Sequence, residues 1–339
     1  MTFLFLLLSF TLQAGCGETA APEGEDAQVI FRYYHSGVGD ARLLDENYIL
    51  TTRDRKLIGI DIEKGKIRRY NIEADWLDVD QESGTVLYTN AAFQLGAVRL
   101  DENRNIIHNE ILYSNQESDY MIDPSVLKLG DSYYISLTFA NGTLNNSSPE
   151  KKNGKYSIRF FKSEDLKSVT YLSDVVSENR NLEDVKLASD GEKLLLMFEK
   201  ETVDQGYSNL QICVSEDKGL SWNSPISLFE LNADYEPASL IRNGDGWDVF
   251  YSSDLENPGQ SYNGALFYRA GLSDDLEIKT LNERVILARE SSSRGQSPEY
   301  AQKGGILGYD VQMFDGKVYY LYAENHATDD NLCVSVSVK

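Results

Sequence analysis

The sequence predicts an all-β protein, a six-bladed β-propeller closed by its own N-terminal strand. Three observations predict this fold. A hairpin pattern recurs six times, an acidic Gly-containing turn recurs in full or reduced form, and the composition favours strands. The chain of 339 residues holds 21 Tyr and 13 Phe but only 7 Pro, and it has no long apolar stretch with helical periodicity.

Each copy of the hairpin pattern is an apolar strand, a short turn of Gly, Asp, Glu or Ser, and a second apolar or aromatic strand. One or two further strand-like segments follow every copy. Six four-stranded sheets in succession are typical of propeller blades. The first strands of the six copies fall at 41–44, 76–79, 126–129, 185–187, 239–241 and 311–314.

The sixth copy lacks a fourth strand, because only the segment 332–336 follows its hairpin. The segment 29–34, ahead of the first blade, can supply the missing strand. Joining the two ends of the chain would remove the exposed strand edges of an open array. The alternative interpretation is a stack of β-sandwiches. We assign residues 28–339 to the propeller domain.

The acidic turn is the segment 215–222, which reads Ser-Glu-Asp-Lys-Gly-Leu-Ser-Trp. Asp217 can accept hydrogen bonds from the turn, Gly219 can take a positive φ, and Trp222 can pack back between the strands. Reduced copies lie at 163–166 and 273–276. The spelling resembles the Asp-box (BNR repeat) of six-bladed sialidase-like propellers. The alternative is that Ser-x-Asp is simply a common turn.

The N-terminal segment resembles a bacterial lipoprotein signal. Residues 2–12 are apolar and too short to span a bilayer, and Ala14 and Gly15 precede Cys16. We expect a signal peptide at 1–15, a lipid on Cys16 and a flexible tether at 16–27. The protein would then be anchored to the membrane, at the bacterial cell surface or in the periplasm. A plain secretory signal is the alternative.

The formal net charge of −22 argues against nucleic acid or an anionic membrane surface as a partner. No zinc motif, phosphate-binding Gly loop or Ser/His/Asp arrangement stands out. We therefore expect no cofactor, no metal and a monomer.

The predicted inner strands open with acidic residues, and these should converge on the central channel at the face that carries the long loops. Mutual repulsion would keep one carboxyl protonated as a general acid beside an ionised base or nucleophile, which is what glycoside hydrolysis needs. The alternative is that the acids bind a cation, cap backbone N–H groups or are solvated. The acids are Asp40, Asp75, Asp123, Glu183, Asp184, Glu236 and Asp310.

Two of these acids precede Pro, in Asp123-Pro124-Ser125 and Glu236-Pro237-Ala238, which resembles the strand starts of glycoside hydrolase family 43. Glu236 with Tyr309 is similar to the Glu-assisted Tyr of sialidases. Sialidases bind a substrate carboxylate with three arginines, but the first-blade Arg-Ile-Pro is replaced by Gly39-Asp40-Ala41 here and no Arg follows Phe250-Tyr251. Because of this departure from the sialidase pattern, we expect the acidic channel to reject an anionic sugar and to favour a neutral glycan.

The sequence thus predicts a glycosidase in which channel carboxylates act on a carbohydrate. The catalytic candidates are Glu236, Asp123 and Glu183, with Asp40 and Asp310 tuning them; the sugar-stacking candidates are Tyr309, Tyr235, Tyr120 and Trp76. A non-catalytic lipoprotein that binds a glycan or a protein is the alternative.

Overall fold

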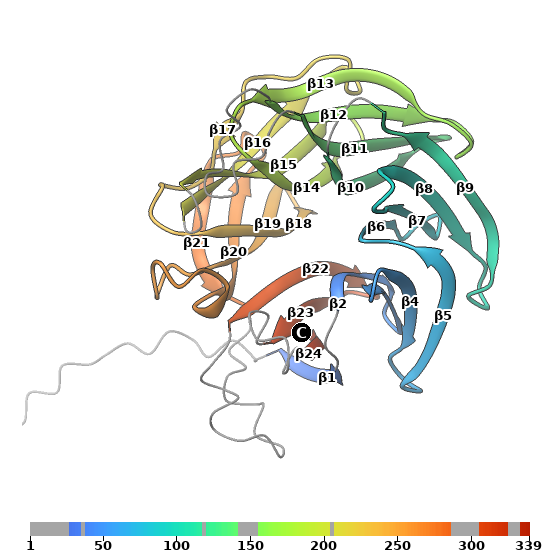
Figure 1. Cartoon of the computed structure of the whole chain (residues 1–339). Coiled ribbons are helices and arrows are strands. Elements are labelled where there is room, and N and C mark those ends of the chain that lie inside the picture. The colour runs from blue at the N-terminus through green and yellow to red at the C-terminus, as the bar shows by residue number, and fades with distance from the viewer. Residues whose placement is uncertain are drawn as a thin grey trace, which may run out of the picture.

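The protein is a ring of six four-stranded antiparallel sheets (Figure 1). The computed structural model describes residues 27–34, 38–116, 120–141, 155–203, 207–285, 305–324 and 333–339. All six predicted hairpins are present as the first and second strands of the six sheets, which confirms the six-bladed propeller. The predicted signal peptide, Cys16 and most of the tether lie outside the described residues.

In every blade the first strand is innermost, and the strands follow one another outward. The first three blades consist of β2 (Val38–Asp45), β3 (Tyr48–Arg53), β4 (Lys56–Asp61) and β5 (Lys66–Glu73); β6 (Trp76–Asp80), β7 (Thr85–Thr89), β8 (Gln94–Leu100) and β9 (Ile106–Ser114); and β10 (Tyr120–Leu129), β11 (Ser132–Asn141), β12 (Lys155–Ser163) and β13 (Thr170–Glu178).

The other three blades consist of β14 (Leu182–Ser189), β15 (Leu194–Val203), β16 (Tyr207–Ser215) and β17 (Ile226–Ser227); β18 (Tyr235–Asn243), β19 (Gly246–Ser253), β20 (Leu266–Ser273) and β21 (Ile278–Arg284); and β22 (Ile306–Phe314), β23 (Lys317–Glu324) and β24 (Cys333–Val338) with β1 (Gln28–Tyr34). A single 3₁₀ turn of the described residues, η1 (Ser261–Asn263), lies between β19 and β20.

The N-terminal strand closes the ring, as predicted. β1 pairs antiparallel with β24, from Gln28 opposite Val338 to Tyr34 opposite Cys333, so the sixth sheet has the order β22-β23-β24-β1. The six inner strands contact their neighbours all the way round, including β22 with β2. The closure thus covers the outer edge of β24 with a strand from the other end of the chain.

Apolar side chains fill the spaces between neighbouring blades. The largest such cluster among the described residues lies between the fourth and fifth blades, where the rings of Phe229, Tyr235 and Tyr251 pack against one another at centroid distances of 4.7 to 5.8 Å. Fully burying one large side chain stabilises a fold by about 1.5–3 kcal/mol. The packing of adjacent blades therefore supports the rigid ring on which the site is built.

The turn at 215–222 forms the hydrogen bonds that its residues predict. Asp217 accepts from the backbone and the hydroxyl of Ser221, at 2.8 and 2.6 Å, and Gly219 has a φ of +86°. The ring of Trp222 packs edge-on against Phe160 of the neighbouring blade at 5.0 Å. The turn thus ties the third blade to the fourth. Within the described residues no helix is long and apolar enough to cross a membrane.

Candidate active site

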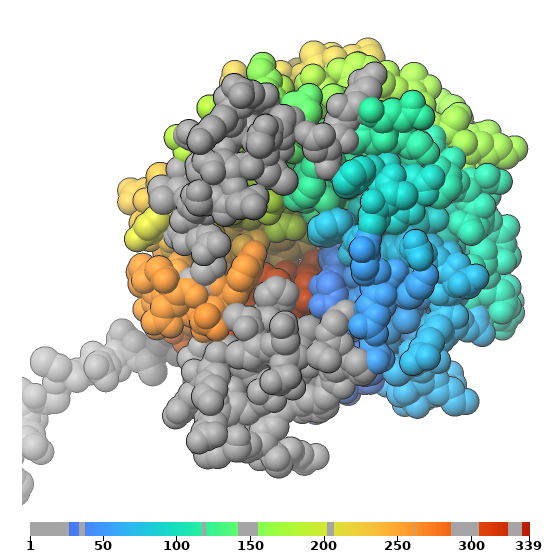
Figure 2. All heavy atoms as spheres, in the orientation of Figure 1, coloured from blue at the N-terminus to red at the C-terminus, as the bar shows by residue number. Residues whose placement is uncertain are grey.

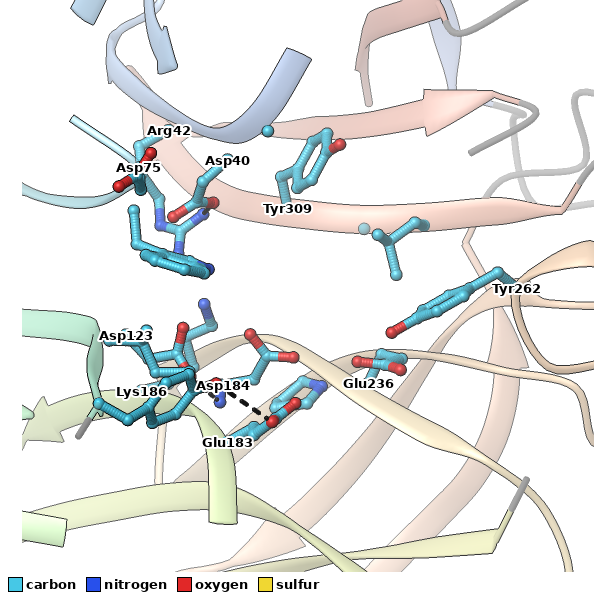
Figure 3. A pocket seen from close by; sticks show the side chains of 17 residues that line it. Asp40, Arg42, Asp75, Asp123, Glu183, Asp184, Lys186, Glu236, Tyr262 and Tyr309 are labelled. Atoms are coloured by element: carbon cyan, nitrogen blue, oxygen red, sulfur yellow. Dashed lines mark hydrogen bonds and ion pairs between the residues drawn. The ribbon is translucent and has the colours of Figure 1, made fainter. Parts of the chain in front are cut away.

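A cavity of about 410 Å³ lies at one end of the central channel, where the inner strands of all six blades begin. Figure 2 shows the hollow at the centre of the ring, and Figure 3 shows the side chains that line it. Its walls are acidic, with aromatic rings between the acids. The acids are Asp40, Asp75, Asp123, Glu183, Asp184 and Glu236, and the aromatic residues are Trp76, Tyr120, Tyr262 and Tyr309.

Irregular backbone at the start of the inner strands directs these side chains. The pairing of first and second strands shifts register in five blades, between residues 38/41, 122/125, 183/186, 237/239 and 308/310. Asp123 and Asp184 have φ values of 48° and 53°, in the left-handed region that few residues other than Gly adopt. Such bulges turn a side chain away from the regular alternation, and they are common beside active sites.

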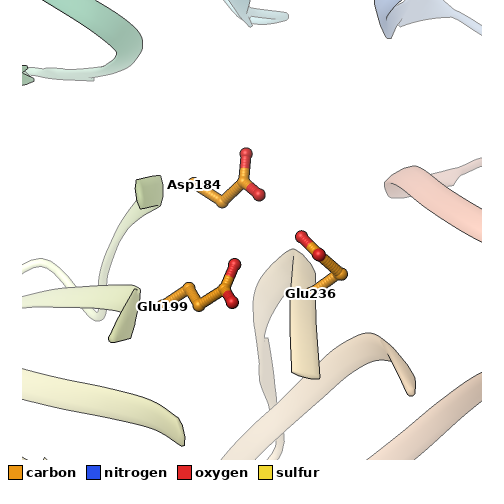
Figure 4. Close-up of side chains that lie close together, drawn as sticks. All are labelled: Asp184, Glu199 and Glu236. Carbon is orange, nitrogen blue, oxygen red and sulfur yellow. The ribbon is translucent and has the colours of Figure 1, made fainter. Parts of the chain in front are cut away.

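Three carboxyl groups converge on one side of the cavity (Figure 4). Asp184, Glu199 and Glu236 each have a carboxylate oxygen within 4.8 Å of the others. Burial, together with the neighbouring carboxylates, raises the pKa of both Glu236 and Glu199 well above the ordinary range. This arrangement favours the protonated form of a carboxyl group in the cluster. The same spacing would also suit the oxygen ligands of one divalent cation.

Glu183 and Asp123 lie on the adjoining wall. Burial and the nearby Glu201 raise the pKa of Glu183 to about 7, although Asn181 and the Tyr120 hydroxyl, at 3.4 Å, hydrogen-bond its carboxylate. Burial and its acidic neighbours Asp184 and Glu183 likewise raise the pKa of Asp123. Asp123 nevertheless accepts the backbone N–H of Asp184 at 2.9 Å, which favours its ionised form.

Two cations form the floor of the cavity. Arg42 hydrogen-bonds Asp40 and also Asp78, from Nε at 3.1 Å. Lys186 lies on the opposite side of the ring, in the inner strand of the fourth blade. Both residues also line a second cavity of about 110 Å³ further along the channel. Together they separate the acidic mouth from the rest of the channel.

Several inner-strand acids and serines tie one blade to the next. Asp40 accepts the N–H of Leu77, and Asp78 accepts the N–H of Val126 and the hydroxyl of Ser125. Similar bonds join the third blade to the fourth, the fifth to the sixth, and the sixth to the first; they run from Leu187 N–H to Ser125, from Val311 N–H to Ser239 and from Leu43 N–H to Asp310. Backbone capping, one of the alternatives for these acids, is thus observed.

The structure brings together most of the predicted site residues. Glu236, Asp123, Glu183 and Asp40 line the cavity with Trp76, Tyr120 and Tyr309. Asp310 does not: it lies below Arg42, in the second cavity, and accepts hydrogen bonds from Leu43 N–H at 2.9 Å and from Gln312 at 3.0 Å. Asp310 therefore links the sixth blade to the first through a hydrogen bond to the backbone.

The prediction for Tyr235 was wrong in its placement. Tyr235 is 2% exposed and packs between Phe229 and Tyr251, and its hydroxyl donates to Asn232 at 2.7 Å. Successive side chains of a strand point to opposite faces, so Tyr235 turns away where Glu236 turns in. The ring stabilises the space between blades and does not reach the cavity.

Two important residues were not predicted from the sequence. Glu199 lies on the second strand of its blade, opposite Glu183 in the strand register, and it directly follows the apolar run 194–198. Because Lys200 and Glu201 come next, the sequence does not distinguish it from the polar end of a strand. Tyr262 lies on η1, lines the cavity and hydrogen-bonds Glu236, whose charge raises the pKa of the phenol. Nothing in the local sequence marks it.

No protein-family model matches this sequence, and neither does any curated protein. Solved structures with a similar fold are found. A complex of BT0996 with RGII has a TM-score of 0.50 and 12% identity, and the match covers 92% of this protein and 92% of BT0996.

Two further similar structures contain sugars. The β-1,2-mannobiose phosphorylase of Listeria innocua, in complex with β-1,2-mannobiose, has a TM-score of 0.48 and 11% identity over 94% of this chain and 92% of its own. The α-L-arabinanase of Penicillium chrysogenum with arabinobiose has a TM-score of 0.48 and 11% identity, over 94% and 98%. At these identities the likeness concerns the fold alone.

Proposed function

We propose that the protein is a glycosidase that acts on a neutral glycan in the acidic cavity, with Glu236 as the general acid. The observation that carries this proposal is the convergence of three carboxyl groups, those of Glu236, Asp184 and Glu199, whose oxygens lie within 4.8 Å of one another. Carboxyl groups this close cannot all ionise, so one remains protonated near neutral pH. A carboxylic acid kept protonated in an open cavity can donate its proton to a leaving-group oxygen.

The second group that glycoside hydrolysis requires is an ionised carboxylate. We assign this role to Asp123, with Glu183 as the other candidate. Burial and the neighbouring acids raise the pKa of Asp123 overall. The N–H of Asp184, which it accepts, and the nearby ammonium of Lys186 oppose this rise and favour its ionised form. It lies across the cavity from Glu236 (Figure 3), which leaves room for a glycosidic bond between them.

The shape and charge of the cavity favour a neutral sugar. About 410 Å³ is within the usual size of a small-molecule site, and Trp76, Tyr120 and Tyr309 offer ring faces for the apolar side of a sugar. The cavity is lined by six acidic residues and only two basic ones, and one of these two, Arg42, is paired with Asp40 and Asp78. The net charge of −22 acts in the same direction and disfavours an anionic substrate.

The cellular setting is part of the proposal. A signal at 1–15 and a lipid on Cys16 would hold the propeller at the cell surface through the tether at 16–27. Mass spectrometry of the N-terminus of the protein from its native membrane tests this. A lipid-modified Cys16 is the expected result, and a mature chain that starts downstream without lipid would contradict it. We also assign the turn at 215–222 to the Asp-box type, on the hydrogen bonds between Asp217 and Ser221.

The test of the activity compares wild type with Glu236→Gln on a panel of aryl glycosides and neutral oligosaccharides. Glutamine keeps the shape and removes the transferable proton, so we expect turnover to fall by about 10²-fold or more while sugar binding persists. Glu277→Gln, the same change at an exposed position of the same blade, is the control. Hydrolysis that survives in Glu236→Gln would remove Glu236 from the mechanism. Binding without turnover in wild type would favour the non-catalytic alternative.

A further inference from the structure

Lys186 lies at the floor of the cavity, in the middle of the inner strand of the fourth blade. It lines both the acidic cavity and the smaller cavity beneath it, and only 9% of it is exposed. A lysine buried to this extent is uncommon unless its ammonium is paired. The surroundings of this side chain therefore indicate what its ammonium is placed to bind.

The described residues give Lys186 neither a salt bridge nor a side-chain hydrogen bond, in contrast to Arg42 across the floor, which is bound to Asp40 and Asp78. Ser125 and Ser239 occupy the position of Lys186 in the two neighbouring blades, and both already form hydrogen bonds with other residues. Ser125 donates to Asp78 and accepts Leu187 N–H; Ser239 donates to Asp310 and accepts Val311 N–H. The floor thus holds an ammonium that opens onto the two cavities and whose partner is not supplied by these neighbours.

Asp123 lies near Lys186 but does not pair with it. The ammonium is close enough to lower the pKa of the Asp123 carboxyl, yet no salt bridge joins the two groups. Both side chains line the same cavity. A charged donor and a carboxylate acceptor that face one cavity without touching can be bridged by a group that both accepts and donates hydrogen bonds.

We propose that Lys186 is a specificity-determining residue that binds a hydroxyl oxygen of the sugar, while the adjacent hydroxyl of the same ring donates to Asp123. This inference rests on the proposed function and deepens it: the sugar in this subsite must carry two neighbouring free hydroxyls. Adjacent hydroxyls match the donor and acceptor together. A carboxylate or phosphate group would satisfy Lys186 but would face the acids of the wall.

The test measures binding, so it does not depend on turnover. Titrations by calorimetry and ligand-observed NMR would use the methyl glycosides of mannose, glucose, galactose and arabinose, together with glucuronate and inorganic phosphate. The proteins are wild type, Lys186→Met and Lys186→Gln. Lys128→Met, on the inner strand of the third blade and outside both cavities, is the control. Thermal melting establishes that each variant is folded.

We expect at least one neutral methyl glycoside to bind wild type. Its Kd should rise about tenfold or more in Lys186→Met, because a charge-assisted hydrogen bond is lost, and less in Lys186→Gln, which keeps a donor. Removing one of the two hydroxyls from that glycoside should weaken its binding to wild type and abolish the difference between wild type and Lys186→Met.

Neutral sugars that bind Lys186→Met as tightly as wild type would overturn this inference and leave the proposed function standing. Glucuronate or phosphate as the ligand that depends on Lys186 would overturn this inference and also contradict the neutral substrate of the proposed function. If no neutral sugar binds wild type and the glycoside panel shows no hydrolysis, the proposed function and this inference both fail.

Discussion

The phenol of Tyr262, on the loop between β19 and β20, hydrogen-bonds the carboxyl group of Glu236 at the start of β18. The relationship joins a residue of a connecting loop to the acid at the centre of the proposed mechanism. Other polar neighbours of Glu236 are acids, and they raise its pKa. The hydrogen bond from Tyr262 opposes them, because it favours the ionised carboxylate.

Tyr262→Phe should therefore raise the pKa of Glu236 further. If Glu236 acts as a general acid, activity is lost as pH rises through this pKa, so the alkaline limb of kcat/KM should move to higher pH by about one unit. The measurement is a pH–rate profile on the best glycoside of the panel. Tyr171→Phe, an exposed tyrosine on β13, serves as the control. An unmoved limb would mean that Tyr262 does not tune the acid.

Asp310→Ala should reduce stability more than activity. The change removes the acceptor of Leu43 N–H and one anion near Arg42, both of them buried. An orphaned buried donor costs about 1–3 kcal/mol, and disturbing a buried ion cluster adds to this. We expect a lower melting temperature with near-normal turnover per folded molecule. If the variant lost turnover but kept the melting temperature of wild type, Asp310 would have a role in catalysis after all.

Trp222→Ala should destabilise the fold without affecting the cavity. Trp222 packs on Phe160 and donates to Ser173 at 3.2 Å, so its loss removes a link between the third and fourth blades. A buried aromatic residue truncated to Ala costs about 3–5 kcal/mol, and a half-buried one costs less. Denaturant unfolding measures the effect. Unchanged stability together with weaker sugar binding would show that this turn lies at the face of the site.

The architecture could be predicted from the sequence because each blade repeats the same short pattern of strand, turn and strand. Apolar strands separated by short turns, as at Asp190–Gly191 and Asp315–Gly316, fix the hairpins wherever they occur. The closing strand followed from counting strands in the last blade. Neither inference needs long-range geometry.

The candidate site could be predicted only in part, because the direction of a side chain depends on bulges that the sequence does not reveal. Asp123 and Asp310 both stand just ahead of a predicted inner strand, yet the first lines the acidic cavity and the second lies beneath Arg42. Tyr235 was misplaced because strand alternation puts it opposite Glu236. Tyr262 joins the site through a loop of a blade whose strands were assigned correctly, and only the folded chain shows it.

The buried acids also predict how stability depends on pH. Glu183, whose pKa rises to about 7 on folding, holds its proton in the folded state at pH values where the unfolded chain has lost it. A raised carboxyl pKa contributes stability that is fully present below the unfolded value of about 4.5 and is lost as pH rises through the folded value. Asp123, Glu199 and Glu236 act in the same direction.

We therefore expect the melting temperature to fall as pH is raised from about 5 to about 8, by an amount equivalent to up to about 3 kcal/mol for one group shifted this far. The window avoids lower pH, where acids with lowered pKa such as Asp217 lose their contribution. Glu183→Gln should flatten the curve, because the amide does not ionise, whereas Glu277→Gln should not. A melting temperature that is constant or rises across this window would contradict the raised pKa values on which the protonated acid depends.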